Sequence, residues 1–224
     1  MTCTKASLVS TKRLRFAPVV DKWDGVYTLT DKQKILRACE DAKPTVYIKG
    51  IELMFSLDIR IGELRALQKS DVDLQNGTIN VAHQMVDVET DTAKRHPVRV
   101  DIMKGKQEAG KRVQPLSKRA ERVIRELFEA YPDTVWLLPN KSQNEPIYTN
   151  RFNENLRKIC EKAGVKYFSS HGIRFHNISA MYDAGVNEKE IQRMSGHTTA
   201  NMTRHYNKSI STIDESAKIR AILG

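Results

Sequence analysis

The chain has 224 residues and carries 37 Lys and Arg against 27 Asp and Glu, which gives a formal net charge of +10. Hydrophobic residues make up 40% of it, enough for a buried core, so a disordered chain is excluded and a polyanion such as nucleic acid is favoured as partner. Its three separated cysteines exclude a disulfide framework and a zinc ribbon, and no apolar run is long enough for a membrane span. We therefore expect a soluble, cytoplasmic protein.

The N-terminal part divides into an irregular segment and two helices. Residues 1–28 are basic and irregular, and we interpret them as an arm or linker. The letters TDKQ at 30–33 form a capping box and predict a helix that continues to about Ala42. Pro44 then opens a second apolar helix, which leads into the segment DIRIGEL at 58–64.

The middle of the chain changes to strand-like patterns after an Asn-Gly pair. Three β-branched stretches are separated by polar turns: TINVAHQMV (78–86), VRVDIMK (98–104) and RVQPL (112–116). Short alternating stretches of this kind are typical of an antiparallel sheet. The sequence therefore predicts one small three-stranded antiparallel sheet.

Helical patterns resume after this sheet. Their spacing and stop signals predict helices at 120–131, 152–163, from 171 to Gly185, and from 187 onward. The fold class that follows is α+β, a mostly helical domain with the three-stranded sheet on one side.

The letters HGIRFH at 171–176 place two histidines and an arginine at a helix start. His171 and Arg174 are three apart and share a helix face, and Ser169 or Ser170 can cap a helix whose amides favour an anion. The two histidines are five apart, whereas a zinc-binding helix pairs them at four. The pattern favours a phosphate site over a metal site, and an ordinary exposed helix start is the alternative.

The C-terminal third adds a histidine and a tyrosine in MSGHTTANMTRHY, with His197 23 residues after Arg174 and Tyr206 nine further on. Together with Arg60 in DIRIGEL and His171, this order resembles the tyrosine recombinase or phage integrase family, whose signature is Arg, His-x-x-Arg, His or Trp, and Tyr. The resemblance covers roughly residues 29–210.

One departure from the family concerns the residue after the second arginine, which is most often histidine in the family and is Phe175 here. His176 therefore does not take the place of that motif histidine. We expect His176 to serve local packing or to lie on the surface.

The resemblance implies an activity and roles for the site residues. Tyr206 would be the nucleophile that cleaves DNA and forms a 3′-phosphotyrosyl link, with no metal, other cofactor or ATP. Arg60 and Arg174 would hold phosphate oxygens through their planar guanidinium groups. His171 and His197 would hydrogen-bond the phosphate or manage protons.

Two further residues complete the expected site. The family's general-acid lysine lies in a hairpin between strands, where its spacing from a Pro-Leu pair selects Lys106, with Lys104 as the rival. Glu63, three residues after Arg60, can orient that arginine by a charge-assisted bond, and a plain surface ion pair is the alternative.

The resemblance also implies partners and an arrangement of domains. We expect double-stranded DNA with attachment or crossover sites as substrate, a tetramer in the synaptic complex, and association with the nucleoid when DNA is bound. Residues 29–210 would form the catalytic domain, and residues 211–224 a C-terminal helix that docks on a neighbouring protomer or on its own domain. A type IB topoisomerase and a catalytically silent DNA-binding relative are the alternatives to an integrase of a phage or mobile element.

Overall fold

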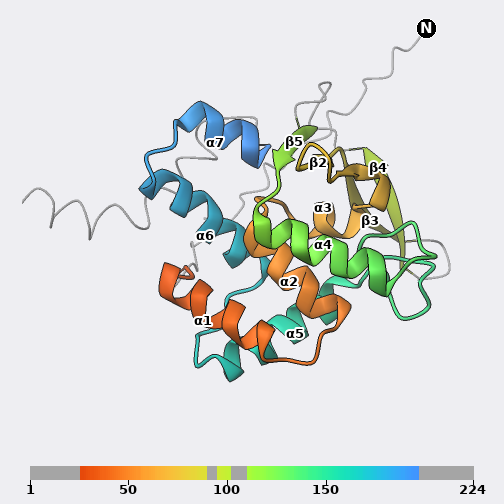
Figure 1. The fold of residues 1–224 in the computed structure, drawn as a ribbon, viewed down its shortest axis with the longest axis horizontal. Helices are drawn as coiled ribbons and strands as arrows, with labels where there is room; N and C mark the ends of the chain where they lie inside the picture. Colours follow the sequence, from red (N-terminus) through yellow and green to blue (C-terminus); the bar gives the residue numbers. More distant parts are fainter. Residues whose placement is uncertain (1–25, 90–94, 102–109, 197–224) are drawn as a thin grey trace, which may run out of the picture.

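The computed structural model describes residues 26–89, 95–101 and 110–196 (Figure 1). Its α-helices are α1 (Leu29–Glu40), α2 (Val46–Ser56), α3 (Ile61–Ala66), α4 (Lys118–Ala130), α5 (Thr149–Lys162), α6 (Ser170–Asp183) and α7 (Glu188–Ser195). Between α3 and α4 lie a 3₁₀ turn (Lys69–Asp71) and the strands β1 (Val72–Asp73), β2 (Thr78–Val81), β3 (His83–Glu89), β4 (Arg95–Asp101) and β5 (Arg112–Pro115). The predicted α+β class is confirmed. In the described ranges, no helix has the length and apolar character needed to cross a membrane.

The helical part is built around α2, whose sequence is apolar on nearly every side. Eight of its 11 residues are buried. A helix that is apolar all round belongs in the interior of a domain. Accordingly, α2 packs against α1, α4, α5 and α6, and Figure 1 shows it between α4 and α5.

The starts of α1 and α2 differ from the predicted ones. The cap of α1 is Thr28, whose hydroxyl accepts from the Asp31 amide at 3.1 Å while an Asp31 carboxylate oxygen accepts from the Thr28 amide at 2.9 Å. The capping box predicted at 30–33 was therefore wrong, because the carboxylate of Asp31 gives the reciprocal bond two residues earlier. Helix α2 is capped by Thr45, which accepts from the Ile48 amide at 3.3 Å, and not opened by Pro44.

A three-stranded antiparallel sheet is present, with β2 between β1 and β5. Its register pairs Val72 with Ile79 and Asn80 with Val113. Strands β2 and β5 lie in the predicted stretches 78–86 and 112–116. The third strand is β1, which was not predicted, whereas residues 98–101 of the predicted 98–104 stretch belong to β4 and do not join this sheet.

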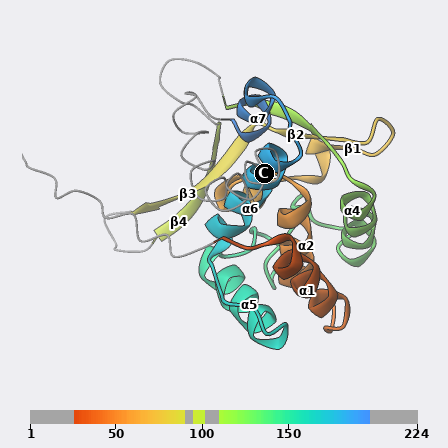
Figure 2. The same cartoon turned by 90° about the vertical axis from the view of Figure 1, so that its left-hand side faces the viewer.

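Strands β3 and β4 form a separate antiparallel pair with Val86 opposite Val98. The predicted 78–86 strand is thus two strands divided at Ala82, since Val81 packs into the main core whereas β3 packs on α3. Figure 2 shows the pair projecting on the side away from α4. This placement makes β3 one wall of the site described below.

The segment before α1 takes part in the core. Tyr27 is 1% exposed, and its ring lies edge-on to those of Phe55 and Phe168, with ring centres 5.8 and 5.1 Å away. Its hydroxyl accepts from the Phe168 amide at 2.8 Å. Although residues 1–28 were expected to be arm or linker, the packing of this ring ties residue 27 to the helical domain.

Candidate active site

The N-terminus of α3 presents Arg60 beside a buried carboxylate. The Arg60 amide donates to Oε2 of Glu63 at 2.8 Å, and its Nη1 donates to Oε1 at 2.9 Å. The Glu63 side chain is 1% exposed and the Arg60 side chain is 27% exposed. One edge of the guanidinium is thus anchored while the side chain keeps access to solvent. The contact predicted from their spacing is confirmed.

The second arginine, Arg174, lies on α6 and is 1% exposed. Its Nη1 donates to the Asp58 carbonyl at 3.2 Å and lies 3.3 Å from Oδ1 of that carboxylate, and its Nη2 donates to the Ser195 carbonyl. The Ser195 hydroxyl donates to the other oxygen of the Asp58 carboxylate. Arg174 therefore joins α6 to the turn before α3 and to the end of α7.

Arg60, Arg174 and His171 line the same cavity, which has a volume of about 390 Å³. Its other walls include Gly62 on α3 and Met85 on β3. A Cβ at position 62 would lie 3.2 Å from the Met85 carbonyl, so glycine lets the strand approach the helix closely. The fold brings together residues that are more than a hundred positions apart in the sequence.

His171 occupies the first turn of α6 and opens to solvent through the cavity. Partial shielding from water, followed by repulsion from Arg174 and Arg60, holds the pKa of His171 below its ordinary value. The neutral imidazole is therefore favoured, and it can donate at one ring nitrogen and accept at the other. Ser169 precedes the helix, but its side chain makes no capping hydrogen bond.

His176 lies in the core, 4% exposed, and not in the cavity. Its Nδ1 is 2.6 Å from the Tyr27 carbonyl, and its ring lies edge-on to Phe55. The prediction of local packing is confirmed.

Within the ranges that the structure covers, no group of three or more His, Cys, Asp or Glu side chains could hold a metal ion.

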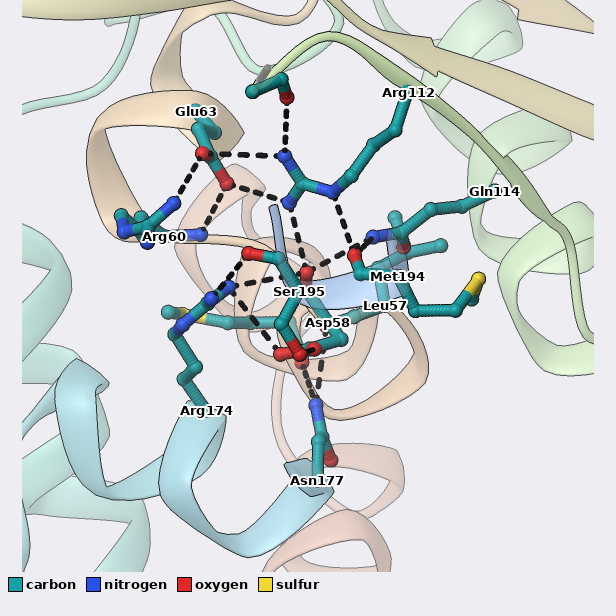
Figure 3. A network of polar contacts seen from close by, with 12 residues as sticks. Leu57, Asp58, Arg60, Glu63, Arg112, Gln114, Arg174, Asn177, Met194 and Ser195 are labelled. Atoms are coloured by element: carbon teal, nitrogen blue, oxygen red, sulfur yellow. Dashed lines mark hydrogen bonds and ion pairs between the residues drawn. The ribbon is translucent and has the colours of Figure 1, made fainter. Parts of the chain in front are cut away.

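Arg112 on β5 was not predicted as a site residue, although it contacts several segments of the site (Figure 3). Its Nη1 and Nη2 donate to Oε1 and Oε2 of Glu63 at 3.3 and 2.8 Å. Its Nε donates to the Met194 carbonyl at 2.6 Å. The remaining bonds go to the carbonyls of Gly110, at 3.1 Å from Nη1, and Asp58, at 2.9 Å from Nη2.

These contacts decide the charge state of Glu63. Burial alone would raise its pKa, but the charge and hydrogen bonds of Arg112, with the charge of Arg60, lower that pKa to about 2. The same cluster lowers the pKa of Arg60 through burial and the nearby charge of Arg174. A guanidinium still remains protonated at neutral pH. The cluster therefore holds a fixed carboxylate among three cations.

The burial pattern of β5 around Arg112 is the opposite of the one that its residue types predict. In β5 the polar residues Arg112 and Gln114 are 6% and 1% exposed, whereas Val113 between them is 51% exposed. The ordinary alternation of a strand would bury the valine. Asp58 and Ser195 were missed as well, since their partners lie in distant parts of the chain. The available signal was two polar residues at a spacing of two beside a basic hairpin.

Four of the residues named from the sequence, Lys104, Lys106, His197 and Tyr206, lie outside the described residues. Their flanking positions can be placed. Gly110 directly follows residues 102–109, and its carbonyl accepts a hydrogen bond from Arg112. Gly196 follows α7 with a φ of 59°, and a Cβ there would lie 3.0 Å from Nη1 of Arg112. Gly110 and Gly196, which flank the two undescribed segments, therefore both lie next to Arg112.

Comparison with known proteins places this arrangement in a family context. The model of the phage integrase family matches residues 27–212. The transposase from transposon Tn916 of Enterococcus faecalis is 24% identical over 197 residues, which cover 81% of this chain and 47% of that protein. Tyrosine recombinase XerA of Thermococcus kodakarensis is 26% identical over 159 residues, 70% of this chain and 48% of that one. The chain spans about half the length of these relatives.

Solved structures share the fold. The Tn1549 transposon integrase in complex with circular intermediate DNA superposes with a TM-score of 0.72 at 18% identity, over 89% of this chain and 67% of that one. The crystal structure of XerA recombinase gives a TM-score of 0.64 at 19% identity, over 81% of this chain and 58% of that one. At these identities the likeness establishes the fold alone, and the chemistry has to be argued from the residues of the site.

Proposed function

The chain belongs to the phage integrase family, and from that premise we propose that it is the catalytic domain of a site-specific DNA recombinase of a phage or another mobile element. The observation that carries the proposal is that Arg60 and Arg174 line one cavity with His171. The relatives named as transposase and tyrosine recombinase support the same activity. The net charge of +10 supports double-stranded DNA as substrate.

The chemistry explains why two guanidinium groups suit this reaction. A phosphodiester under attack develops charge on its non-bridging oxygens, and preorganised cations stabilise that charge. Arg60 is anchored by Glu63, and Arg174 by Asp58, so both can meet the phosphate without being reordered. His171, whose neutral form is favoured, adds a ring N–H group that can donate a hydrogen bond to a phosphate oxygen.

The reaction begins when the Tyr206 hydroxyl passes its proton to His171 or His197 and its oxygen attacks phosphorus. The bond from phosphorus to the 5′-oxygen breaks, the 3′-phosphate becomes linked to the tyrosine, and the 5′-oxygen takes a proton from Lys106 or its rival Lys104. A 5′-hydroxyl of another strand then attacks the phosphotyrosyl link and releases the tyrosine, so no ATP is consumed. His197 joins His171 at the phosphate.

Domain roles and assembly belong to the same proposal. Residues 29–210 form the catalytic domain and residues 1–28 a basic arm or linker, with its last residues anchored through Tyr27. Residues 211–224 form a C-terminal helix that docks on a neighbouring protomer, which links the protomers of a tetramer on two DNA sites. Attachment or crossover sites are the DNA partners, and binding to them associates the protein with the nucleoid.

Covalent trapping tests the proposal. A nicked suicide substrate that carries the element's attachment site releases a short fragment bearing the new 5′-hydroxyl on cleavage, so religation fails and the phosphotyrosyl adduct accumulates. We expect an adduct with the wild type, and none with Tyr206→Phe although DNA is bound within a few-fold. Absence of an adduct with wild type would favour a silent DNA-binding relative. Relaxation of supercoiled plasmid without strand exchange would favour topoisomerase chemistry.

A further inference from the structure

The guanidinium of Arg112 is fully used inside the protein. Arginine has five N–H donors. One bonds the Met194 carbonyl, and the four on Nη1 and Nη2 bond Glu63, Gly110 and Asp58. The side chain is 2% exposed. Arg112 therefore has no donor left for a DNA phosphate, and any effect on the reaction must act through other residues.

The acceptors of Arg112 lie in the segments that carry the proposed catalytic residues. Glu63 holds Arg60 at the start of α3. Gly110 ends the segment that contains Lys106, and Met194 lies three positions before His197. A single side chain thus connects parts of the sequence that are 49 and 82 residues away from it.

Gln114 bonds two of the carbonyls that Arg112 also bonds, so these contacts do not depend on Arg112 alone. Its Nε2 donates to the Asp58 carbonyl at 2.9 Å and to the Met194 carbonyl at 2.8 Å. Those two carbonyls keep a partner when Arg112 is replaced. Among the described residues the Glu63 carboxylate would keep only its bonds from Arg60, so nothing outside that pair would hold the carboxylate that anchors Arg60.

We propose that Arg112 is a positioning residue for strand cleavage, which fixes the Glu63 carboxylate so that Arg60 meets the charged phosphate oxygen. This inference rests on the proposed recombinase function. A lysine at this position keeps the charge but lacks the planar fork, so it can hold one carboxylate oxygen and not both. The Arg60 guanidinium then loses its fixed orientation.

The first experiment measures single-turnover cleavage of the suicide substrate and DNA affinity for Arg112→Lys. Because misplacement of a catalytic group by about 1 Å costs roughly 100-fold in rate, we expect cleavage to slow by about 10- to 100-fold and the Kd to stay within about threefold. Cleavage within about threefold of wild type overturns the inference. If wild type itself forms no adduct, the proposed function fails instead.

Arg99→Lys is the matched control. Arg99, whose side chain is 22% exposed, likewise donates to a carbonyl, that of Ala66 at 2.9 Å, and to a carboxylate, that of Asp71 at 3.0 Å. It does not line the cavity. We expect Arg99→Lys to cleave within about threefold of wild type. An equal loss in both variants means that any buried arginine matters for the fold, and it overturns the special role of Arg112.

A neutral substrate separates positioning from general damage. A methylphosphonate at the scissile position has a methyl group in place of one charged non-bridging oxygen, so it needs less from Arg60. We expect the deficit of Arg112→Lys to shrink by at least about tenfold on this substrate, and the deficit of Arg60→Ala should shrink in the same way. A deficit of the same size on both substrates overturns the inference.

A second variant keeps the test valid if Arg112→Lys folds poorly. Glu63→Gln removes the charge between the two arginines without changing the size of the side chain, and it should reproduce the slow cleavage and the methylphosphonate response. In the double variant the losses should not multiply, because both changes break one chain of contacts. Independent, multiplying losses contradict the proposed route through Glu63.

Discussion

Two buried glutamates in this domain have similar charge partners and different surroundings. Glu63 is 1% exposed and contacts Arg60 and Arg112. Glu52, on α2, is 0% exposed and contacts Lys49 on its own helix and two arginines of α4, Arg119 and Arg122. Both lie in the interior, where an unpaired carboxylate would be costly. Burial and ion pairing therefore cannot tell which of them belongs to a functional site.

The two clusters differ in the exposure of their cations and in what those cations contact besides the glutamate. Around Glu52 the side chains of Arg119 and Arg122 are 32% and 50% exposed, and they reach Glu40 on α1, so this cluster ties α1, α2 and α4 together. Around Glu63, Arg112 is buried and only Arg60 opens toward a cavity, the one that Arg174 also lines. Of the two clusters, it is therefore the one around Glu63 that orients a cation toward the candidate active site.

The largest effect should come from the cations that line the cavity. We expect Arg60→Ala and Arg174→Ala each to slow single-turnover cleavage by about 100- to 1,000-fold, as when one donor to a developing oxyanion is removed. Arg122→Ala, the matched change beside Glu52, should leave the rate within about threefold. Unimpaired cleavage by either cavity variant would show that the cluster around Glu63 is structural only.

The acid stability of the domain should depend on Glu63. Its pKa in the folded protein is about 2, below the ordinary 4.5, so its contribution is complete above about pH 4.5 and is lost as the pH falls toward 2. A shift of this size corresponds to about 3 kcal/mol. In denaturant titrations between pH 6 and 2.5, we expect the free energy of unfolding of Glu63→Gln to fall less steeply than that of wild type. Parallel curves would contradict the assigned pKa.

Glu52→Gln should affect stability without affecting chemistry. Removing one partner of a buried ion pair costs several kcal/mol, but the arginines here are partly solvated and can turn to Glu40. We therefore expect a loss of about 2 kcal/mol in the free energy of unfolding, measured at neutral pH, and cleavage within about threefold of wild type. A large rate loss at full occupancy of the folded state would remove the distinction between the two clusters.

The sequence predicts the contacts between residues that are close together in the chain, and not those between distant segments. His171 and Arg174 are three residues apart, and a helix brings such a pair to one face whatever the rest of the chain does. Arg60 is the cap residue of α3, and Glu63, three positions later, reaches back to its amide in an equally local contact. Both pairs were found in the sequence, and the helices that carry them are present. That the two pairs share a cavity depends on α2, α3 and α6 packing together.

The cluster around Arg112 could not be predicted in this way. Its partners Glu63 and Met194 are 49 and 82 residues distant, and its strand exposes Val113 while burying charge. A local pattern cannot show that a distant carboxylate and several carbonyls will compensate a buried guanidinium. The division of the 78–86 stretch at Ala82 also results from distant contacts, because Val81 before it packs into the main core whereas β3 after it packs on α3.

The smallest effect concerns the titration of His171. Loss of solvent, then the charge of Arg174, then that of Arg60 lower its pKa, so removing a charge without opening the site should raise it. Arg60→Met keeps most of the side-chain volume and removes one of the two cations, so it should raise the pKa of His171. The pKa can be followed by NMR of the histidine ring, with His171→Gln to assign its signal. Arg122→Met removes an equal charge beside Glu52 and should leave His171 unchanged. If both variants shift the pKa equally, the net charge of the protein acts on His171, and the site around Arg60 has no local field of its own.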